Sequence, residues 1–162
     1  MTRHEIQIIW EGPYNCEEVL EKLIDGGNKK NNWDGEDYGV YQIYGKHILC
    51  RNNPLLYIGK AFKQTFSRRF KDHQKWLKDE ENIKIYVGRI YNPKRHSEKD
   101  DWKSWEEDVE LAENILIYKY SPHYNSRSLS EQPNIKPHKS ICLRHIGKKS
   151  RLNPKDLAPD DL

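Results

Sequence analysis

The chain lacks long apolar runs and is poor in cysteine, and both absences narrow what the protein can be. No stretch reaches the ~18 apolar residues of a membrane-spanning helix, and the first residues do not have the pattern of a signal peptide. The three cysteines, Cys16, Cys50 and Cys142, are far apart and form no C-x-x-C pair, which favours a reduced protein over a disulfide-stabilised one. We therefore expect a cytoplasmic protein with no membrane partner.

Charged and aromatic residues are abundant instead. Of the 162 residues, 33% are charged, and five Trp and ten Tyr supply bulky side chains for a core. The length fits one domain, residues 1–162, with a core of its own. No internal repeat is visible.

The charges are segregated along the chain, although the formal net charge is only +3. Segments 60–75 and 133–155 are basic, whereas segment 98–113 is acidic. A basic surface near an acidic one suits a protein that binds a polyanion and also holds a cation. Ordinary solvated surface charge explains the same pattern, so the charges alone do not decide between the two.

Residue periodicity predicts an alternation of strands and helices. Glycine, asparagine and proline mark loops at 26–37 and 126–139 and a long hairpin connection at 45–54. The expected strands are 6–10, 40–44, 55–58, 83–87 and 141–146, and the expected helices are 17–24, 63–78 and 104–120.

The helices expected at 63–78 and 104–120 each carry an apolar stripe. In the helix expected at 104–120, Ser104 and Glu107 have the spacing of a capping box, and Ser121-Pro122 should end the helix. The stripes are Phe62, Phe66, Phe70 and Leu77 in the first helix, and Trp105, Val109, Ala112 and Leu116 in the second.

Two glycine-flanked tyrosines lie in strands that should pair. Tyr41 follows Gly39, and Tyr57 precedes Gly59. A phenol has a pKa of ~10, so it acts as a base only where cations or a histidine lower that pKa. The glycines could allow a close backbone approach or mark bulges. Because tyrosine is a favoured strand residue, a purely structural role explains these positions as well.

Arg69 and His73 are four residues apart on the helix predicted for 63–78, so they share one face. An arginine can bind two oxygens of a phosphate, and a histidine can transfer a proton near neutral pH. Hydrolysis of a phosphodiester uses both functions, and Mg²⁺ bound by a single carboxylate could add positive charge. A solvated basic face explains the same pair without catalysis.

Glu113 lies beside the apolar stripe of the helix predicted for 104–120, at the border between core and solvent. A metal ligand should lie there, but composition alone does not choose Glu113 over Glu110. Asn125, which follows Pro122-His123-Tyr124, would by default be a turn or cap residue.

Taken in order, these residues resemble the GIY-YIG nuclease family. The spacing from Glu113 to Asn125 is similar to that in the nuclease domain of the excision-repair incision protein, and this alignment favours Glu113 over Glu110. The matching elements are Gly39-Val40-Tyr41, Tyr57-Ile58-Gly59-Lys60-Ala61, Ser67-Arg68-Arg69-Phe70 with His73, Ala112-Glu113-Asn114-Ile115-Leu116-Ile117 and Pro122-His123-Tyr124-Asn125.

The resemblance implies an α+β fold in which a small, mainly antiparallel three-stranded sheet is flanked by helices. Residues 39–125 would form this nuclease core. Residues 1–38 would be a strand-helix extension, and residues 126–162 a basic C-terminal extension.

The resemblance also implies hydrolysis of DNA at one divalent cation per active site, Mg²⁺ or Mn²⁺. Glu113 would bind the metal, and Tyr41, assisted by His73, would be the base for the attacking water.

The remaining residues of the family motifs would bind or position the substrate. Arg69 and Tyr57 would bind the scissile phosphate, Lys60 and Arg68 would add phosphate contacts, and Asn125 would brace the site.

The leading interpretation is a DNA endonuclease of the restriction type, which could act as a homodimer. A repair or mobile-element nuclease specific for branched DNA is one alternative, and a nucleic-acid-binding module without activity is another. A zinc site at His138-x3-Cys142-x2-His145 is a third idea, but it lacks a clear fourth ligand, so a chance cluster explains it better.

Overall fold

One six-stranded sheet organises the part of the chain that the computed structural model describes, residues 3–19, 39–62, 64, 66–91, 101–125 and 140–158. Residues 16–19 are also helical. The elements are β1 (Arg3–Tyr14), β2 (Gly39–Tyr44), β3 (Leu55–Ala61), α2 (Phe66–Asp79), β4 (Lys84–Tyr91), α3 (Asp101–Tyr120), β5 (Ser140–Gly147) and β6 (Lys155–Leu157).

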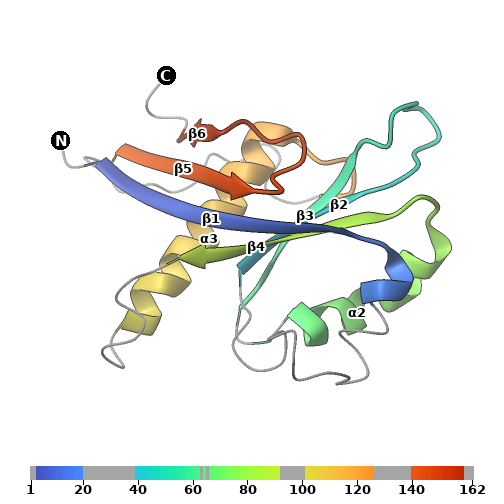
Figure 1. Ribbon diagram of the computed structural model, residues 1–162, viewed down its shortest axis with the longest axis horizontal. Helices are drawn as coiled ribbons and strands as arrows, with labels where there is room; N and C mark the ends of the chain where they lie inside the picture. The colour runs from blue at the N-terminus through green and yellow to red at the C-terminus, as the bar shows by residue number, and fades with distance from the viewer. Residues whose placement is uncertain are drawn as a thin grey trace.

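The strands lie in the order β3-β2-β4-β1-β5-β6, and the sheet curls into a half-barrel (Figure 1). Strands β1 and β5 run parallel, whereas the other neighbouring pairs are antiparallel. The expectation of a small three-stranded antiparallel sheet flanked by helices is therefore wrong.

The expectation was wrong about residues 1–38 and 126–162, which were expected to be extensions outside the core sheet. Strand β1 lies between β4 and β5, and β5 and β6 continue the same sheet beyond it. Only residues 6–10 of β1 have a clear strand pattern, yet the strand has 12 residues. Its partners in the sheet come from distant segments, and no local pattern specifies such pairing.

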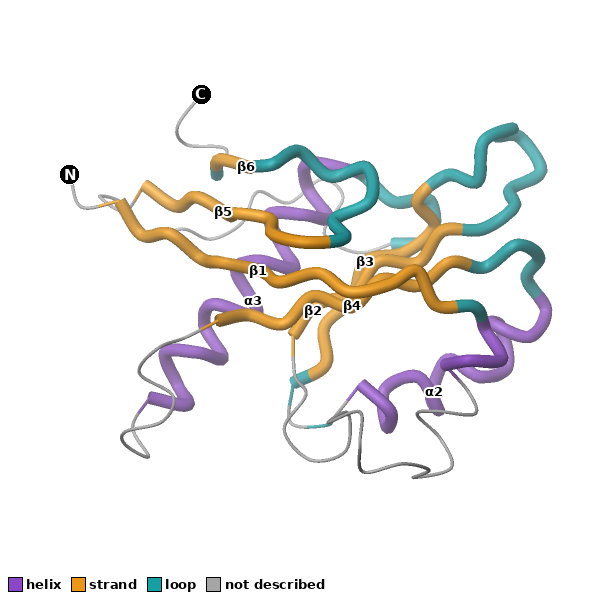
Figure 2. The backbone as a smooth tube through the Cα atoms, in the orientation of Figure 1, coloured by secondary structure: helices purple, strands orange, loops and turns teal. Residues whose placement is uncertain are grey.

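The two faces of the sheet carry separate apolar clusters, because successive side chains of a strand point to opposite faces. Ile8 and Trp10 of β1 pack on one face with Trp105 and Leu116 of α3. Tyr41 and Ile43 of β2 pack on the other face with Phe70 of α2. Figure 2 shows the two helices apart from each other, on either side of the strands.

The predicted helix stripes are largely confirmed. Trp105, Val109, Ala112 and Leu116 are all buried, as are Phe66, Phe70 and Leu77, whereas Phe62 packs against the α3 cluster instead. The capping box is wrong, because α3 begins before Ser104, at Asp101. The helix ends just before Ser121-Pro122, as expected.

Several predicted segments lie outside the described residues. They are the loops 26–37 and 126–139 and most of the helix expected at 17–24. Among the helices that the structure describes, none is long and apolar enough to cross a membrane.

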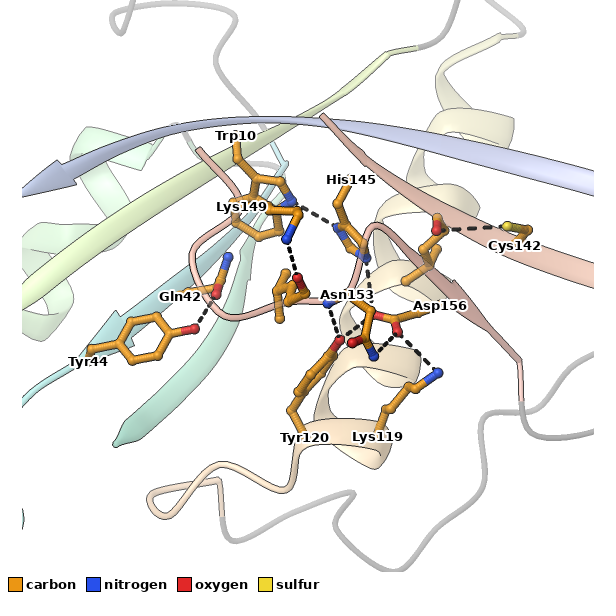
Figure 3. A network of polar contacts seen from close by, with 12 residues as sticks. Trp10, Gln42, Tyr44, Lys119, Tyr120, Cys142, His145, Lys149, Asn153 and Asp156 are labelled. Atoms are coloured by element: carbon orange, nitrogen blue, oxygen red, sulfur yellow. Dashed lines mark hydrogen bonds and ion pairs between the residues drawn. The ribbon is translucent and has the colours of Figure 1, made fainter. Parts of the chain in front are cut away.

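A buried polar network anchors the short strand β6 (Figure 3). The carboxylate of Asp156 accepts hydrogen bonds from the Tyr120 hydroxyl at 2.7 Å and from His145 Nε2 at 3.1 Å. It also pairs with Lys119 Nζ at 3.0 Å. His145 Nδ1 in turn accepts a hydrogen bond of 2.9 Å from the Trp10 indole. The network therefore joins β1, β5, β6 and α3.

Candidate active site

Tyr41 is the centre of the candidate site, and its side chain is completely buried. Its ring lies 4.9 Å from that of Phe70 and 6.0 Å from that of Tyr57. Gly59 stands opposite Tyr41 on β3, and a Cβ atom there would overlap the Tyr41 ring and hydroxyl. The glycine of the second motif is thus required so that the two tyrosines can approach each other.

Helix α2 brings Arg69 and His73 to the Tyr41 hydroxyl. His73 Nε2 lies 2.7 Å from the Tyr41 oxygen, and Arg69 Nε donates to the same oxygen at 3.3 Å. The four-residue spacing predicted this shared face, because residues i and i+4 lie one above the other on a helix. Arg68, the preceding residue, is exposed, so the arginine directed at the tyrosine is Arg69.

The hydrogen bonds around His73 define its tautomer. The Trp76 indole nitrogen donates to His73 Nδ1 at 3.0 Å, and an indole N–H can only donate. Nδ1 must therefore be unprotonated, so the proton of the neutral ring is on Nε2. His73 consequently donates a hydrogen bond to the Tyr41 oxygen rather than accepting one.

The surroundings of His73 keep its imidazole neutral. Burial, together with the nearby Arg69 charge, lowers the pKa of His73 to about 4. At neutral pH the ring therefore acts through a fixed N–H donor and carries no charge.

Burial has the opposite effect on the phenol. Desolvation raises the pKa of Tyr41 well above its usual value, and the opposing effect of Arg69 is smaller. Arg69 lowers this pKa, as a nearby cation should, but burial outweighs it. Two donors, His73 and Arg69, are nevertheless in place to stabilise a phenolate.

Lys60 and Glu113 form the second part of the site. Lys60 Nζ lies 3.0 Å from a carboxylate oxygen of Glu113 and 3.3 Å from one of Glu110. The side chain of Glu113 is 15% exposed, whereas that of Glu110 is 59% exposed. Of the two acids that the sequence left in competition, Glu113 is the one at the border of the core.

The pKa values of both Glu113 and Lys60 are raised, for different reasons. Burial raises the pKa of Glu113, and the charges of Lys60 and Arg69 offset this only in part. Burial by itself lowers the pKa of Lys60, but Glu113 and Glu110 outweigh it and raise that pKa.

The two parts meet around β3, which is one of the two outer strands of the described sheet. Tyr57 and Gly59 face α2, whereas Lys60 faces α3, because side chains alternate along a strand. The Arg69 charge acts on the pKa of Glu113, and the Glu113 charge acts on that of Tyr41. The groups thus share one electrostatic environment.

Asn125 braces β3 from outside the sheet. Its side-chain oxygen accepts a hydrogen bond from the Ile58 amide at 2.9 Å, and its nitrogen donates to the Ile58 carbonyl at 2.8 Å. The side chain replaces the neighbouring strand that an outer strand lacks. This fixes the backbone between Tyr57 and Gly59.

The donor set around Glu113 fits a hard divalent cation bound by one carboxylate. Mg²⁺ prefers oxygen ligands and often takes only one or two from the protein, with water and phosphate oxygens as the others. Glu113 is partly exposed and offers such an oxygen. In this structure the positive charge that neutralises its carboxylate is Lys60.

The zinc arrangement suggested by the sequence is not formed by the residues that the structure describes. Cys142 is buried, and both ring nitrogens of His145 are used by Trp10 and Asp156. His138 lies outside the described residues.

A separate pocket of about 680 Å³ lies between the end of β1 and the α2–β4 connection. Its lining includes Tyr14, Cys16, Glu80 and Lys84. None of the candidate site residues lines this pocket, so the pocket and the candidate site at β3 are separate.

Comparisons of this chain with protein-family models, with curated proteins and with solved structures found no match. A function must therefore be argued from the geometry of the site.

Proposed function

We propose that this chain is a metal-dependent endonuclease that hydrolyses DNA phosphodiester bonds, with a site of the GIY-YIG type. The observation that carries the proposal is the cluster of Tyr41, Arg69 and His73 beside the Lys60–Glu113 pair. These residues come from two strands and two helices. Hydrolysis of a phosphodiester needs phosphate-binding cations, an acid for the metal and a group that accepts a proton, and the cluster has each of these.

Arg69 and Lys60 would bind the scissile phosphate. A guanidinium has five N–H donors, so Arg69 can keep its contact with Tyr41 while it binds phosphate oxygens. Tyr57, which is partly exposed, would add its hydroxyl. Exposed cations along α2 would follow the DNA backbone on either side; these are Arg68, Lys71, Lys75 and Lys78.

Glu113 would hold one Mg²⁺ or Mn²⁺ per active site. When bound, this cation would neutralise charge on the phosphate and orient it for in-line attack. Lys60, released from Glu113, would then be free to pair with the phosphate.

Tyr41 would accept the proton of the attacking water, in its phenolate form. His73 and Arg69 both donate toward its oxygen, so they would stabilise the phenolate and hold it in position. Because burial keeps the pKa of the phenol high, the phenolate fraction, and with it the rate, should rise as the pH increases above 7.

We further propose a restriction-type role in the cytoplasm, with a homodimer that cuts both strands. Repair of branched DNA and DNA binding without cleavage are the competing outcomes of the test.

The proposal is tested with purified protein, supercoiled plasmid and branched oligonucleotides, in Mg²⁺ or in EDTA. Arg69→Ala is compared with Arg68→Ala, a neighbouring arginine whose side chain is exposed. We expect Mg²⁺-dependent cleavage that falls on the order of 100- to 1,000-fold in Arg69→Ala, the usual effect of removing a donor to the transition state, and much less in Arg68→Ala.

Discrete plasmid fragments would support the restriction-type role. Cleavage confined to the branched substrates would assign the repair role instead. DNA binding without any cleavage would contradict the enzyme proposal.

A further inference from the structure

We propose that His47, Cys50 and His123 form a binding site for a transition-metal ion such as Zn²⁺, separate from the Mg²⁺ site proposed at Glu113. His47 and Cys50 belong to the connection between β2 and β3, which projects beyond the end of the sheet (Figure 2). His123 comes from the turn that follows α3. One ligand atom from each of the three side chains lies within 4.8 Å of the others.

One of the distances between ligand atoms already matches that of a tetrahedral site. Bonds of about 2.0–2.3 Å to nitrogen and sulfur place neighbouring ligand atoms roughly 3.3–3.8 Å apart. Cys50 Sγ and His123 Nε2 are already 3.5 Å apart. The imidazole rings of His47 and His123 are stacked with their centroids 4.5 Å apart, so one ring would have to rotate out of this stack for both to direct a nitrogen at the same ion.

Backbone hydrogen bonds hold all three ligand residues in place. The Cys50 amide donates to the His47 carbonyl at 3.1 Å, and the two residues form an antiparallel bridge. The His123 amide donates to the Leu55 carbonyl at 3.3 Å, which ties the third ligand to β3. The ligand residues thus belong to a formed turn and a sheet edge.

The chemistry of the donors selects the class of metal. Two imidazoles and a thiolate suit Zn²⁺, Co²⁺ or Cu⁺, whereas Mg²⁺ and Ca²⁺ prefer oxygen. His123 is exposed and the other two side chains are half-buried, so water or a group from a bound molecule would supply the fourth ligand.

The position of the site suggests a structural role for the ion. Ile48 and Leu49, between the two hairpin ligands, are 95% and 84% exposed, so no apolar packing holds the tip of this turn. A bound ion would cross-link the turn and so stabilise it in place of apolar packing. It would also fix the turn that leads to Asn125, the residue that braces β3.

Cobalt titration of the reduced, metal-free full-length protein tests this site. We expect one Co²⁺ per chain, with thiolate-to-cobalt charge-transfer absorption and the strong visible bands of a four-coordinate ion. Zn²⁺ should displace it and abolish both signals. Cys50→Ser should lose the charge-transfer band, and His123→Ala should weaken binding by at least about 10-fold.

Two matched variants make the test specific. Cys16→Ser, another half-buried cysteine, and Glu113→Gln should both keep the full signal. Absence of a charge-transfer band in the unmodified protein, or its loss in Cys16→Ser and not in Cys50→Ser, would overturn the proposal. Neither result depends on whether the protein cleaves DNA.

Discussion

The side chains around the Tyr41 oxygen are oriented by hydrogen bonds whose direction is determined. Trp76 can only donate to His73, and His73 must then donate to Tyr41. Trp76 therefore acts on the candidate base through His73 and is a positioning residue. No motif in the sequence pointed to it, because its role depends on a hydrogen bond that only the fold makes visible.

Trp76→Phe should show whether the orientation of His73 matters for activity. The substitution keeps an aromatic ring but removes the indole N–H, so the proton of His73 can move to Nδ1 and the donor to Tyr41 is lost. We expect kcat to fall by up to about 100-fold, the lower end of general acid–base contributions, with KM nearly unchanged. Steady-state kinetics across pH 6 to 10 measures this, and an unchanged pH profile and kcat would rule out the positioning role.

Gly59→Ala should damage the site by displacing the tyrosines. The new methyl group would overlap the Tyr41 ring, and such overpacking costs about 1–3 kcal/mol of stability. Misplacement by about 1 Å can reduce a rate by about 100-fold. Urea unfolding and cleavage assays check the two effects.

Gly45→Ala provides the control for this change. A Cβ atom at Gly45 would press on Leu56 and Ile83 at 2.7 and 2.9 Å and not on the tyrosines. It should destabilise the protein without a specific loss of activity. Equal losses of activity in the two variants would mean that Gly59 has only a packing role.

At the scale of elements, two helices and five strands were predictable, whereas the arrangement of the strands in one sheet was not. The stripes of α2 and α3 repeat every three or four residues within one segment, so Phe70 and Leu116 could be assigned to the core from the sequence. The same local spacing placed Arg69 beside His73. Local periodicity therefore accounts for the part of the candidate site that lies on α2.

The order of the strands depends on contacts between distant segments. Ile8 of β1 pairs with Ile90 of β4 on one side and with His145 of β5 on the other. Nothing in residues 3–14 specifies these partners, and the family resemblance directed attention to residues 39–125. The pairing of Lys60 with Glu113 likewise joins a strand and a helix far apart in the chain, and no pattern in the sequence predicted it.

Asp156 should be the main polar anchor of β6 (Figure 3). Burial opposes ionisation, but hydrogen bonds from His145, Tyr120 and other neighbours outweigh it and lower the pKa of Asp156 to about 2, from 3.8. Asp156→Asn leaves these buried donors poorly matched, so we expect a loss of about 2–3 kcal/mol in the free energy of unfolding at pH 7.

The pH dependence of this loss has a defined sign. A carboxylate with a lowered pKa stabilises the fold fully above its unfolded pKa, and this contribution disappears as the pH falls from about 4 to about 2. The difference between Asp156→Asn and the unmodified protein in urea unfolding should shrink over that range, while the exposed Asp79→Asn should show little effect at any pH. A difference that stays constant down to pH 2 would mean that the charge of Asp156 does not stabilise β6.

At the scale of the whole molecule, the candidate site lies on β3, an outer strand, where two helices approach from opposite faces of the sheet. A sheet edge leaves access for a long polymer, which an enclosed cavity would not. Helix α2 carries exposed cations as well as Arg69 and His73, and two acids of α3, Glu110 and Glu113, pair with Lys60. The basic segment 60–75 and the acidic segment 98–113 therefore contact each other through Lys60.

The most direct test of this account compares Glu113→Gln with Glu110→Gln in Mg²⁺-dependent cleavage of plasmid DNA. Both acids pair with Lys60, but only Glu113 is largely buried beside the cluster. We predict that Glu113→Gln loses cleavage by at least on the order of 100-fold, because metal catalysis contributes several kcal/mol, while it still folds and binds DNA. Glu110→Gln should retain most of the activity. Equal activities of the two variants, or full cleavage by Glu113→Gln, would contradict the proposed metal site and with it the central claim.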